Sequence, residues 1–235
     1  MLAVTDCRLP GDCRSSLREL GFEVLPLPPF PALPAPVASH PDMLFFLLGG
    51  VLLTHRDYYK IAKSEIDHIT SAGRFELVMS DEPVGDKYPQ DVLFNAAPVS
   101  RFILGRADSM SRHISEIAAK NGARIIGVRQ GYARCSTVIV GDSAIITQDR
   151  DIARSAQECG IDVLLVRPRY VRLEGYDTGF IGGASGTCSD KVFFCGSLDN
   201  HPDGESIRKF CLAHGKKAVS LGKGELFDAG TLFFI

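Results

Sequence analysis

Three side chains suited to acid–base and nucleophilic chemistry stand just before predicted strands of this 235-residue chain. His40 and Asp42 lie two residues apart, so on a beginning strand both side chains would leave on the same face. Cys135 immediately precedes the most apolar strand of the sequence. If brought together, an imidazole, a carboxylate and a thiol could transfer protons, bind a cation and attack an electrophilic carbon. We therefore assign catalysis to Cys135, His40 and Asp42.

These residues also have plainer interpretations. His40 could be solvated in a surface turn where Asp42 caps backbone amides, and Cys135 could be a buried structural thiol. Cys188 is a second candidate nucleophile, with Asp190 two residues on and therefore on its own face. A nucleophilic Cys135 paired with His40 should have a lowered pKa and a populated thiolate near neutral pH.

Further carboxylates occupy matching places at the openings of predicted strand–helix units. They belong to Asp91, Asp190 and Asp228, and with Asp42 they would repel one another in a shared cavity. A bound guanidinium or amine would relieve this repulsion through paired hydrogen bonds. A metal ion is a second solution, although no metal ligands are assigned, and the capping of local turns is a third.

Polar and glycine residues near the same strand openings complete the candidate site. Gly182-Gly183-x-x-Gly186 could present backbone amides to an anion, or could only permit a tight turn. We expect a small cationic guanidino or amine compound as the ligand, and no cofactor. The expected substrate-binding residues are Asp91, Asn95, Gln130, Gly182, Gly183, Cys188 and Asp190.

A repeated pattern of elements would position these residues. The fourth copy is the clearest, with paired strands at 136–140 and 144–147, a helix capped by Asp149, a stop at Gly160 and a strand at 161–166. The same order recurs from strands at 43–47, at 92–96 and at 191–195. The expected helix caps of these copies are Asp57, Asp108 and Asp203, and the expected stops are Gly73, Gly122 and Gly215.

The first unit is split between the two ends of the chain. It has a strand at 2–5, a helix from Asp12 to a stop at Gly21, and a strand at 22–27, while its remaining strand is at 231–235. Pairing of the terminal strands would remove exposed edges and close five ββαβ units around a central cavity. The sequence therefore predicts an α/β propeller with five-fold pseudo-symmetry. It forms a single domain over 1–235, with a proline-rich crossover at 26–41 between units one and two.

This plan resembles the pentein fold of the guanidino-group-modifying enzymes. HPDMLFF (40–46), QGYARCSTVIV (130–140) and GFIGGASG (179–186) look like signature segments of a bacterial branch of that superfamily with no assigned function. In the enzymes a cysteine thiolate attacks a guanidinium carbon, a histidine shuttles protons and carboxylates hold the guanidinium. Their histidine lies in an H-x-D-x-x-F-like segment, the form of 40–45, and their cysteine follows a glycine-rich stretch that 182–188 resembles. The resemblance implies a Cys/His-dependent hydrolase or deiminase-like enzyme acting on a small guanidino or amidino compound. The alternative is a non-catalytic pentein that binds a ligand or a protein.

Composition excludes several other classes of function. A net charge near −2 gives no electrostatic support for binding nucleic acid or an anionic membrane. The N-terminus has no basic segment followed by a long apolar one, and the longest apolar run, 43–53, is too short to span a bilayer. Seven cysteines without zinc-ligand spacing indicate free thiols in a reducing cytosol, so we expect a cytoplasmic protein. The sequence specifies no oligomeric state.

Overall fold

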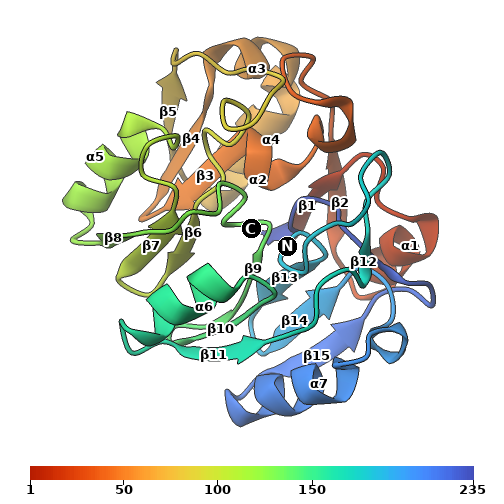
Figure 1. Ribbon diagram of the computed structural model, residues 1–235. Coiled ribbons are helices and arrows are strands. Elements are labelled where there is room, and N and C mark those ends of the chain that lie inside the picture. The colour runs from red at the N-terminus through yellow and green to blue at the C-terminus, as the bar shows by residue number, and fades with distance from the viewer.

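Five similar units surround one axis in the computed structural model, which describes residues 1–235 (Figure 1). Each unit contains a three-stranded sheet whose middle strand pairs antiparallel with one neighbour and parallel with the other. Parallel neighbours need a crossover, and here helices make it on the rim of the ring. The first strands of the units lie towards the centre (Figure 1).

The five units follow one another around the ring in chain order. The first contains β17 (Phe233–Phe234), β1 (Leu2–Asp6), α1 (Gly11–Glu19) and β2 (Glu23–Leu27), and the second contains α2 (Pro41–Leu44), β3 (Phe45–Leu48), β4 (Val51–His55), α3 (Arg56–Ile61), α4 (Lys63–Gly73) and β5 (Glu76–Ser80). The third contains β6 (Ala97–Val99), β7 (Phe102–Gly105), α5 (Arg112–Lys120) and β8 (Arg124–Gly127), and the fourth contains β9 (Thr137–Gly141), β10 (Ala144–Thr147), α6 (Arg150–Gln157) and β11 (Asp162–Leu165). The fifth contains β13 (Ser185–Cys188), β14 (Lys191–Phe194), α7 (Gly204–Ala213) and β15 (Lys217–Ser220), while β12 (Val171–Arg172) pairs with β16 (Leu226–Phe227).

The terminal strands close the ring. In the antiparallel pair of β1 and β17, Ala3 lies opposite Phe234 and Val4 lies opposite Phe233. Leu2 and Ile235 exchange two backbone hydrogen bonds of 2.6 and 2.9 Å beyond this pair. The predicted pairing of the chain ends is therefore confirmed, and it leaves no open edge on β1.

Apolar burial follows the same five-fold arrangement. The buried side chains form five clusters, and each cluster contains side chains of at least two neighbouring units. Tyr58 of unit two, for example, lies in one cluster with Val4 of unit one, whereas Cys195 of unit five shares another with Leu17 of unit one. A unit alone would leave half of each cluster in water, so the ring is the smallest arrangement that buries them all.

Some of the predicted helix caps and helix ends agree with the structure, and others do not. Asp149 caps α6 by accepting hydrogen bonds from two backbone amides, as predicted. The predicted caps Asp57 and Asp108 are wrong, because His55 caps α3 and Ser111 caps α5. The left-handed stop of the second unit falls on Arg74 (φ 53°), one residue after Gly73.

Two strand predictions are also wrong. The apolar run at 92–96 is irregular chain packed beneath units two and three, and the first strand of unit three is β6. In unit five, residues 191–195 correspond to the second strand rather than the first, because β13 precedes them. This shift moves the hairpin turn of unit five to Ser189 and Asp190.

The proline-rich segment between units one and two packs against the body of the ring. Phe30, Leu33 and Val37 are buried in the cluster shared by those units. The guanidinium of Arg8 donates to the carbonyl oxygens of Ala35 and Pro36, at 3.2 and 2.7 Å. No helix of the chain is both long and apolar enough to cross a membrane.

Candidate functional site

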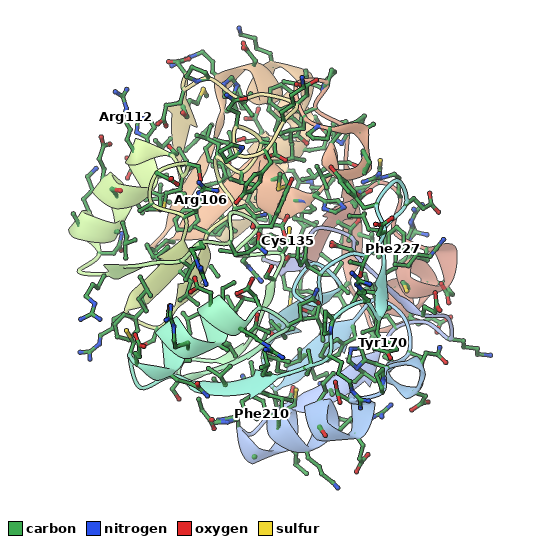
Figure 2. All side chains as sticks on the ribbon, viewed as in Figure 1. Arg106, Arg112, Cys135, Tyr170, Phe210 and Phe227 are labelled. Atoms are coloured by element: carbon green, nitrogen blue, oxygen red, sulfur yellow. The ribbon has the colours of Figure 1, made fainter.

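The segments that precede the first strands meet at the axis and bury a group of polar side chains. Figure 2 shows Cys135 near the middle of the ring. Every member of this central cluster has an exposed fraction of 2% or less. The central cluster consists of Asp6, His40, Asp42, Asn95, Cys135, Asp228 and Thr231.

Cys135 and Asp42 are in direct polar contact within the central cluster. Asp42 lies in α2, a single turn that begins after His40, so the expected strand at this position is wrong. The turn nevertheless directs Asp42 inwards, and its two carboxylate oxygens lie 3.1 and 3.2 Å from Cys135 Sγ. The thiol therefore donates to the carboxylate, which also accepts a 2.8 Å hydrogen bond from Thr231 Oγ1.

Asn95 fixes the position of the thiol. Its Oδ1 accepts from the backbone amides of Arg134 and Cys135, at 2.8 and 3.2 Å. Its Nδ2 lies 3.1 Å from Cys135 Sγ. One side chain from unit three thus holds both the backbone and the sulfur of the cysteine from unit four.

The imidazole of His40 lies between two carboxylates without a hydrogen bond to either. Nε2 is 3.5 Å from Asp6 Oδ2, and Nδ1 is 3.8 Å from Asp228 Oδ1. Both ring nitrogens are fully buried and have no hydrogen-bond partner. The backbone of Gly230 packs so closely on this residue that a Cβ at Gly230 would lie 2.1 Å from His40 Cβ.

Burial dominates the electrostatics of the central cluster. It raises the pKa of the Cys135 thiol well above its usual range, and the nearby charges of Asp42 and Asp228 add to this. Both effects oppose the thiolate that is expected near neutral pH. Burial also raises the pKa of Asp228 to about 6, although His40 and two backbone amides oppose the shift. For Asp6 burial acts in the same direction, but hydrogen bonds from Arg8 and the nearby His40 outweigh it and lower its pKa.

Four other predicted substrate-binding residues lie outside the central cluster. Asp91 is buried, but its carboxylate accepts from the hydroxyl of Tyr132. Gln130 is half-buried and bonds to the amide of Tyr132 and to Asp149. The structure does not bring Cys188 and Asp190 to the centre, because both lie at the hairpin end of unit five. Cys188 Sγ is 3.0 Å from Met1 Sδ, and the exposed Asp190 pairs with Lys191 at 3.0 Å.

Gly182 and Gly183 allow the backbone of unit five to approach the central cluster. The amide of Gly183 donates to the carbonyl oxygen of Cys135 at 2.7 Å, so it is already occupied. A Cβ at Gly183 would lie 1.9 Å from Asp228 Oδ1, and one at Gly182 would lie 2.5 Å from the Cys135 carbonyl oxygen. In this structure the two glycines act through close approach rather than as free amide donors.

Two members of the central cluster were not found from the sequence. Asp6 ends β1, and its oxygens accept three hydrogen bonds from Arg8. Thr231 has a left-handed backbone (φ 68°) and donates to Asp42 and to the carbonyl oxygen of Gly182. The Asp-x-Arg spacing was the only local signal for Asp6, and Thr231 had none because it reaches Asp42 only through ring closure.

The donor set of the central cluster is also suited to a metal ion. His40, Asp42 and Cys135 each offer one donor atom, and the three atoms lie within 4.8 Å of one another. All three residues are buried.

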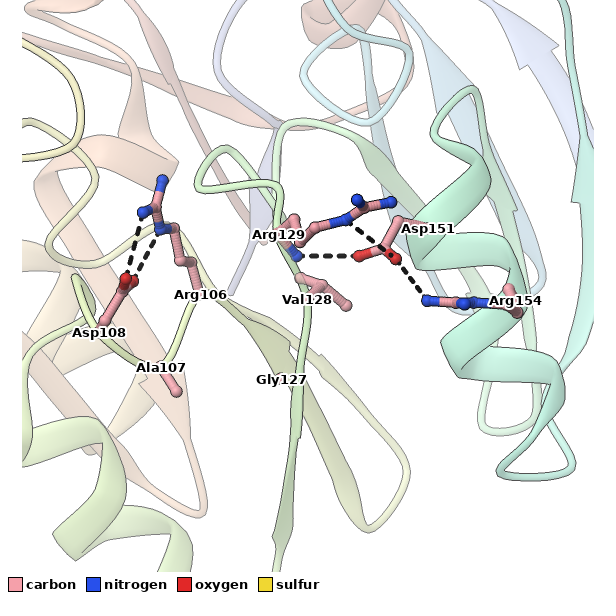
Figure 3. A pocket seen from close by; sticks show the side chains of 8 residues that line it. All are labelled: Arg106, Ala107, Asp108, Gly127, Val128, Arg129, Asp151 and Arg154. Carbon is pink, nitrogen blue, oxygen red and sulfur yellow. Dashed lines mark hydrogen bonds and ion pairs between the residues drawn. The ribbon is translucent and has the colours of Figure 1, made fainter.

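The largest open pocket lies away from these residues. It is a cleft of about 750 Å³ between units three and four, which we call the arginine cleft (Figure 3). Its charged groups are already paired. Arg106 binds Asp108, while the backbone amide of Arg129 and the guanidinium of Arg154 donate to Asp151.

Comparisons with known proteins agree with this architecture. The model of a family, described as "Family of unknown function (DUF6873)", matches residues 4–233. The chain belongs to this family. No curated protein sequence is significantly similar to it.

Solved structures show which fold the family has. DDAH from Pseudomonas aeruginosa, a cysteine-to-serine mutant complexed with citrulline, matches with a TM-score of 0.59 at 9% identity, covering 94% of this chain and 91% of that chain. Agmatine deiminase from C. jejuni matches with a TM-score of 0.53 at 10% identity, covering 94% and 87%. SxtG, an amidinotransferase from Microseira wollei in the saxitoxin biosynthetic pathway, matches with a TM-score of 0.53 at 11% identity, covering 94% and 88%. These proteins share the pentein fold, so this chain has the pentein fold.

Proposed function

We propose that this pentein is a hydrolase that uses Cys135 to cleave a C–N bond of a small guanidino or amidino compound. The observation that carries the proposal is the contact of the Cys135 thiol with both carboxylate oxygens of Asp42, beside the imidazole of His40. A nucleophile, a base and a proton carrier then share one buried site. The structural likeness to guanidino-modifying enzymes supports the same chemistry at the level of fold.

A planar cation would satisfy the electrostatics of this site. Asp6 already pairs with Arg8 at 2.6 Å, whereas the buried Asp42 and Asp228 have no ion pair with an arginine or a lysine. Buried carboxylates are costly without positive partners. A guanidinium or amidinium can donate paired hydrogen bonds to such oxygens. Its charge would also lower the pKa of the Cys135 thiol, which burial and the charges of Asp42 and Asp228 raise. The nucleophile therefore becomes reactive when the substrate is bound.

The bond changes then follow from the contacts. The thiol proton passes to Asp42 as the bond between Sγ and the guanidinium carbon forms. The C–N bond to the leaving amine breaks, and that nitrogen takes up the proton, relayed through His40. Water adds to the carbon and His40 accepts its proton. The Sγ–C bond then breaks, and His40 returns that proton to the sulfur, which restores the thiol. The net reaction adds one water across one C–N bond and needs no oxidant or reductant.

The substrate must enter through a part of the structure that opens. Tyr88, Tyr132 and Phe180 form a stack with ring centroids 5.6 and 5.7 Å apart. Tyr88 is 46% exposed, whereas the backbone amide of Phe180 donates to Asp228 of the central cluster at 2.8 Å. The stack thus runs from solvent to the central cluster, and displacing it would admit a small ligand.

A second candidate function is a non-catalytic pentein that binds a small cation or a protein. The burial of the whole central cluster and the raised pKa of Cys135 favour it, because a protonated, inaccessible thiol is a poor nucleophile. Such a module would need no reactive cysteine, so thiol chemistry separates the two functions.

The test is cysteine mapping with two alkylating reagents, chloroacetamidine and the neutral iodoacetamide. We expect chloroacetamidine to modify Cys135 at least ~10-fold faster than iodoacetamide does, because its amidinium is drawn to the carboxylates. Asp42→Asn should abolish this preference. The same change should speed the neutral reagent, because loss of the charge lowers the pKa of the thiol.

Cys188→Ser is the matched control, since Cys188 lies at the hairpin end of unit five. It should leave the labelling of Cys135 unchanged. Equally slow labelling of Cys135 by both reagents would reject the hydrolase in favour of the binding module.

A further inference from the structure

We infer that the central cluster binds one zinc ion through Cys135 Sγ, an oxygen of Asp42 and a ring nitrogen of His40, and that the ion blocks the site when bound. The zinc site goes beyond the proposed hydrolase and does not depend on it, because the same three side chains could bind zinc in a non-catalytic protein. Only the competition between zinc and substrate rests on the proposed function.

The state of His40 points to a missing partner. Buried polar groups are nearly always hydrogen-bonded, yet both nitrogens of this fully buried imidazole have no partner. An imidazole nitrogen is a common zinc ligand, and a metal bond would satisfy the orphan nitrogen without a hydrogen-bond donor. The surroundings hold the ring in place, because Gly230 packs against it.

The distances suit tetrahedral zinc after a small adjustment. Zinc–ligand bonds of about 2.0 to 2.3 Å at tetrahedral angles place donor atoms roughly 3.3 to 3.6 Å apart. Cys135 Sγ already lies 3.1 and 3.2 Å from the oxygens of Asp42, and all three donor atoms lie within 4.8 Å of one another. A shift of about 1 Å would bring the imidazole into the same sphere, by the tetrahedral distances above.

The side chains around the three ligands are those expected outside a zinc site. A metal-bound histidine usually directs its other ring nitrogen at a carboxylate. His40 has a carboxylate on each side, Asp6 near Nε2 and Asp228 near Nδ1, so either nitrogen could bind the ion while the other donates. Asn95 and Thr231 bond to the sulfur and the carboxylate, which would orient both ligands.

The chemistry of the donors selects zinc over the harder cations. Magnesium and calcium prefer all-oxygen sites, whereas sulfur, nitrogen and oxygen together suit zinc. Binding would release the thiol proton, so a Zn–S bond replaces an S–H bond with no change in oxidation state. The ion would balance the charges of the thiolate and Asp42. Because the proposed substrate needs the same two groups, zinc and substrate would exclude each other.

The first experiment measures the metal bound by chelator-treated, full-length protein. After zinc loading and desalting, elemental analysis should find about one ion per chain, and cobalt titration should produce a thiolate-to-metal charge-transfer band. Cys135→Ser and His40→Asn should each weaken binding at least ~100-fold, as expected when one of only three ligands is lost. Cys188→Ser should bind like wild type. Unchanged zinc binding in both Cys135→Ser and His40→Asn would overturn the inference.

A second measurement needs no variant and so does not depend on how the variants fold. Zinc X-ray absorption of the wild-type protein should show one sulfur at about 2.3 Å with nitrogen and oxygen ligands at about 2.0 to 2.2 Å. A spectrum without a sulfur ligand would equally overturn the inference. Because neither measurement uses a substrate or an alkylating reagent, the zinc site and the hydrolase can fail independently.

Discussion

The central cluster and the arginine cleft contain similar kinds of side chain in opposite surroundings. His40 at the centre is fully buried between carboxylates and has no hydrogen bond. In the cleft the side chains of Arg129 and Arg154 are 87% and 67% exposed, and both lie near the carboxylate of Asp151. The larger opening therefore contains charges that are already neutralised, whereas Asp42 and Asp228 in the closed centre have no arginine or lysine partner.

This difference shows why the size of a pocket alone does not locate the chemistry here. A charge pair in water is worth at most about 1 kcal/mol, because solvent screens it. Away from water the same charges interact several times more strongly, and an unpaired group is costly. The central cluster is where a ligand would change the energy most, although it is the less open of the two regions.

The largest expected difference between the two regions is steric. Gly183→Ala should lower the free energy of unfolding by at least ~3 kcal/mol, because the new Cβ would lie 1.9 Å from Asp228 Oδ1. Asp228 is held by the backbone amides of Phe180 and Gly230 and cannot retreat without losing hydrogen bonds. Urea denaturation of the purified variant measures the loss.

Gly127→Ala is the matched control in the arginine cleft. Gly127 lines the cleft, and no atom lies within 4 Å of a Cβ built there. This substitution should change the free energy of unfolding by less than ~1 kcal/mol. Equal losses in the two variants would show that the centre is no more tightly packed than the cleft.

The next largest effect is on the pH dependence of stability. The pKa of Asp228 is about 6 in the folded chain against 3.8 for the free side chain, because it is buried. The folded state therefore holds this proton more tightly than the unfolded state, so the contribution of Asp228 to stability falls as pH rises from about 4 to about 6. The difference between these two pKa values corresponds to roughly 3 kcal/mol in the free energy of unfolding.

Asp228→Asn removes this titration and provides the comparison. The difference in unfolding free energy, wild type minus variant, should fall by up to ~3 kcal/mol between pH 4 and pH 7 in the presence of chelator. Measuring the difference cancels other titrating groups, such as His201, whose pKa is lowered by burial. A difference that stays constant with pH would mean that Asp228 is not desolvated as the structure indicates.

The ring could be predicted from the sequence because each unit contains its own signals. The β-branched run before Gly141, the cap at Asp149 and the stop at Gly160 specify unit four locally. Repetition of that order then implies closure, because no unit can bury its apolar face alone. The placement of His40, Asp42 and Cys135 at equivalent positions followed from the same repetition, and the structure brings these three together.

The predictions of strands and site residues failed where the local sequence pattern does not reflect the environment of the residues in the folded chain. Residues 92–94 are apolar because they pack under two units as irregular chain, and periodicity cannot distinguish that from a buried strand. The strand β13 reads SGTC, which lacks a β-branched apolar run, so unit five was placed one strand too late. That single shift assigned Cys188 and Asp190 to the wrong end of the hairpin. Asp6 and Thr231 could not be assigned to the site because His40 and Asp42, which they approach there, are distant from them in sequence.

The smallest expected effect concerns the ion pairs of the arginine cleft. Asp151→Asn should lower the free energy of unfolding by less than ~1 kcal/mol, because the arginines it would leave are exposed to water. Hydrogen bonds, first from the backbone amide of Arg129, lower the pKa of Asp151, so any stability that its charge contributes is present at neutral pH and lost in acid. An asparagine oxygen can still accept from that amide, so most of the interaction should survive. Urea denaturation of the variant at low and high salt measures the loss of stability. Zinc binding by the same variant shows whether the central cluster is affected. A loss above ~2 kcal/mol, or a change in zinc binding, would mean that the cleft and the central cluster are coupled rather than independent.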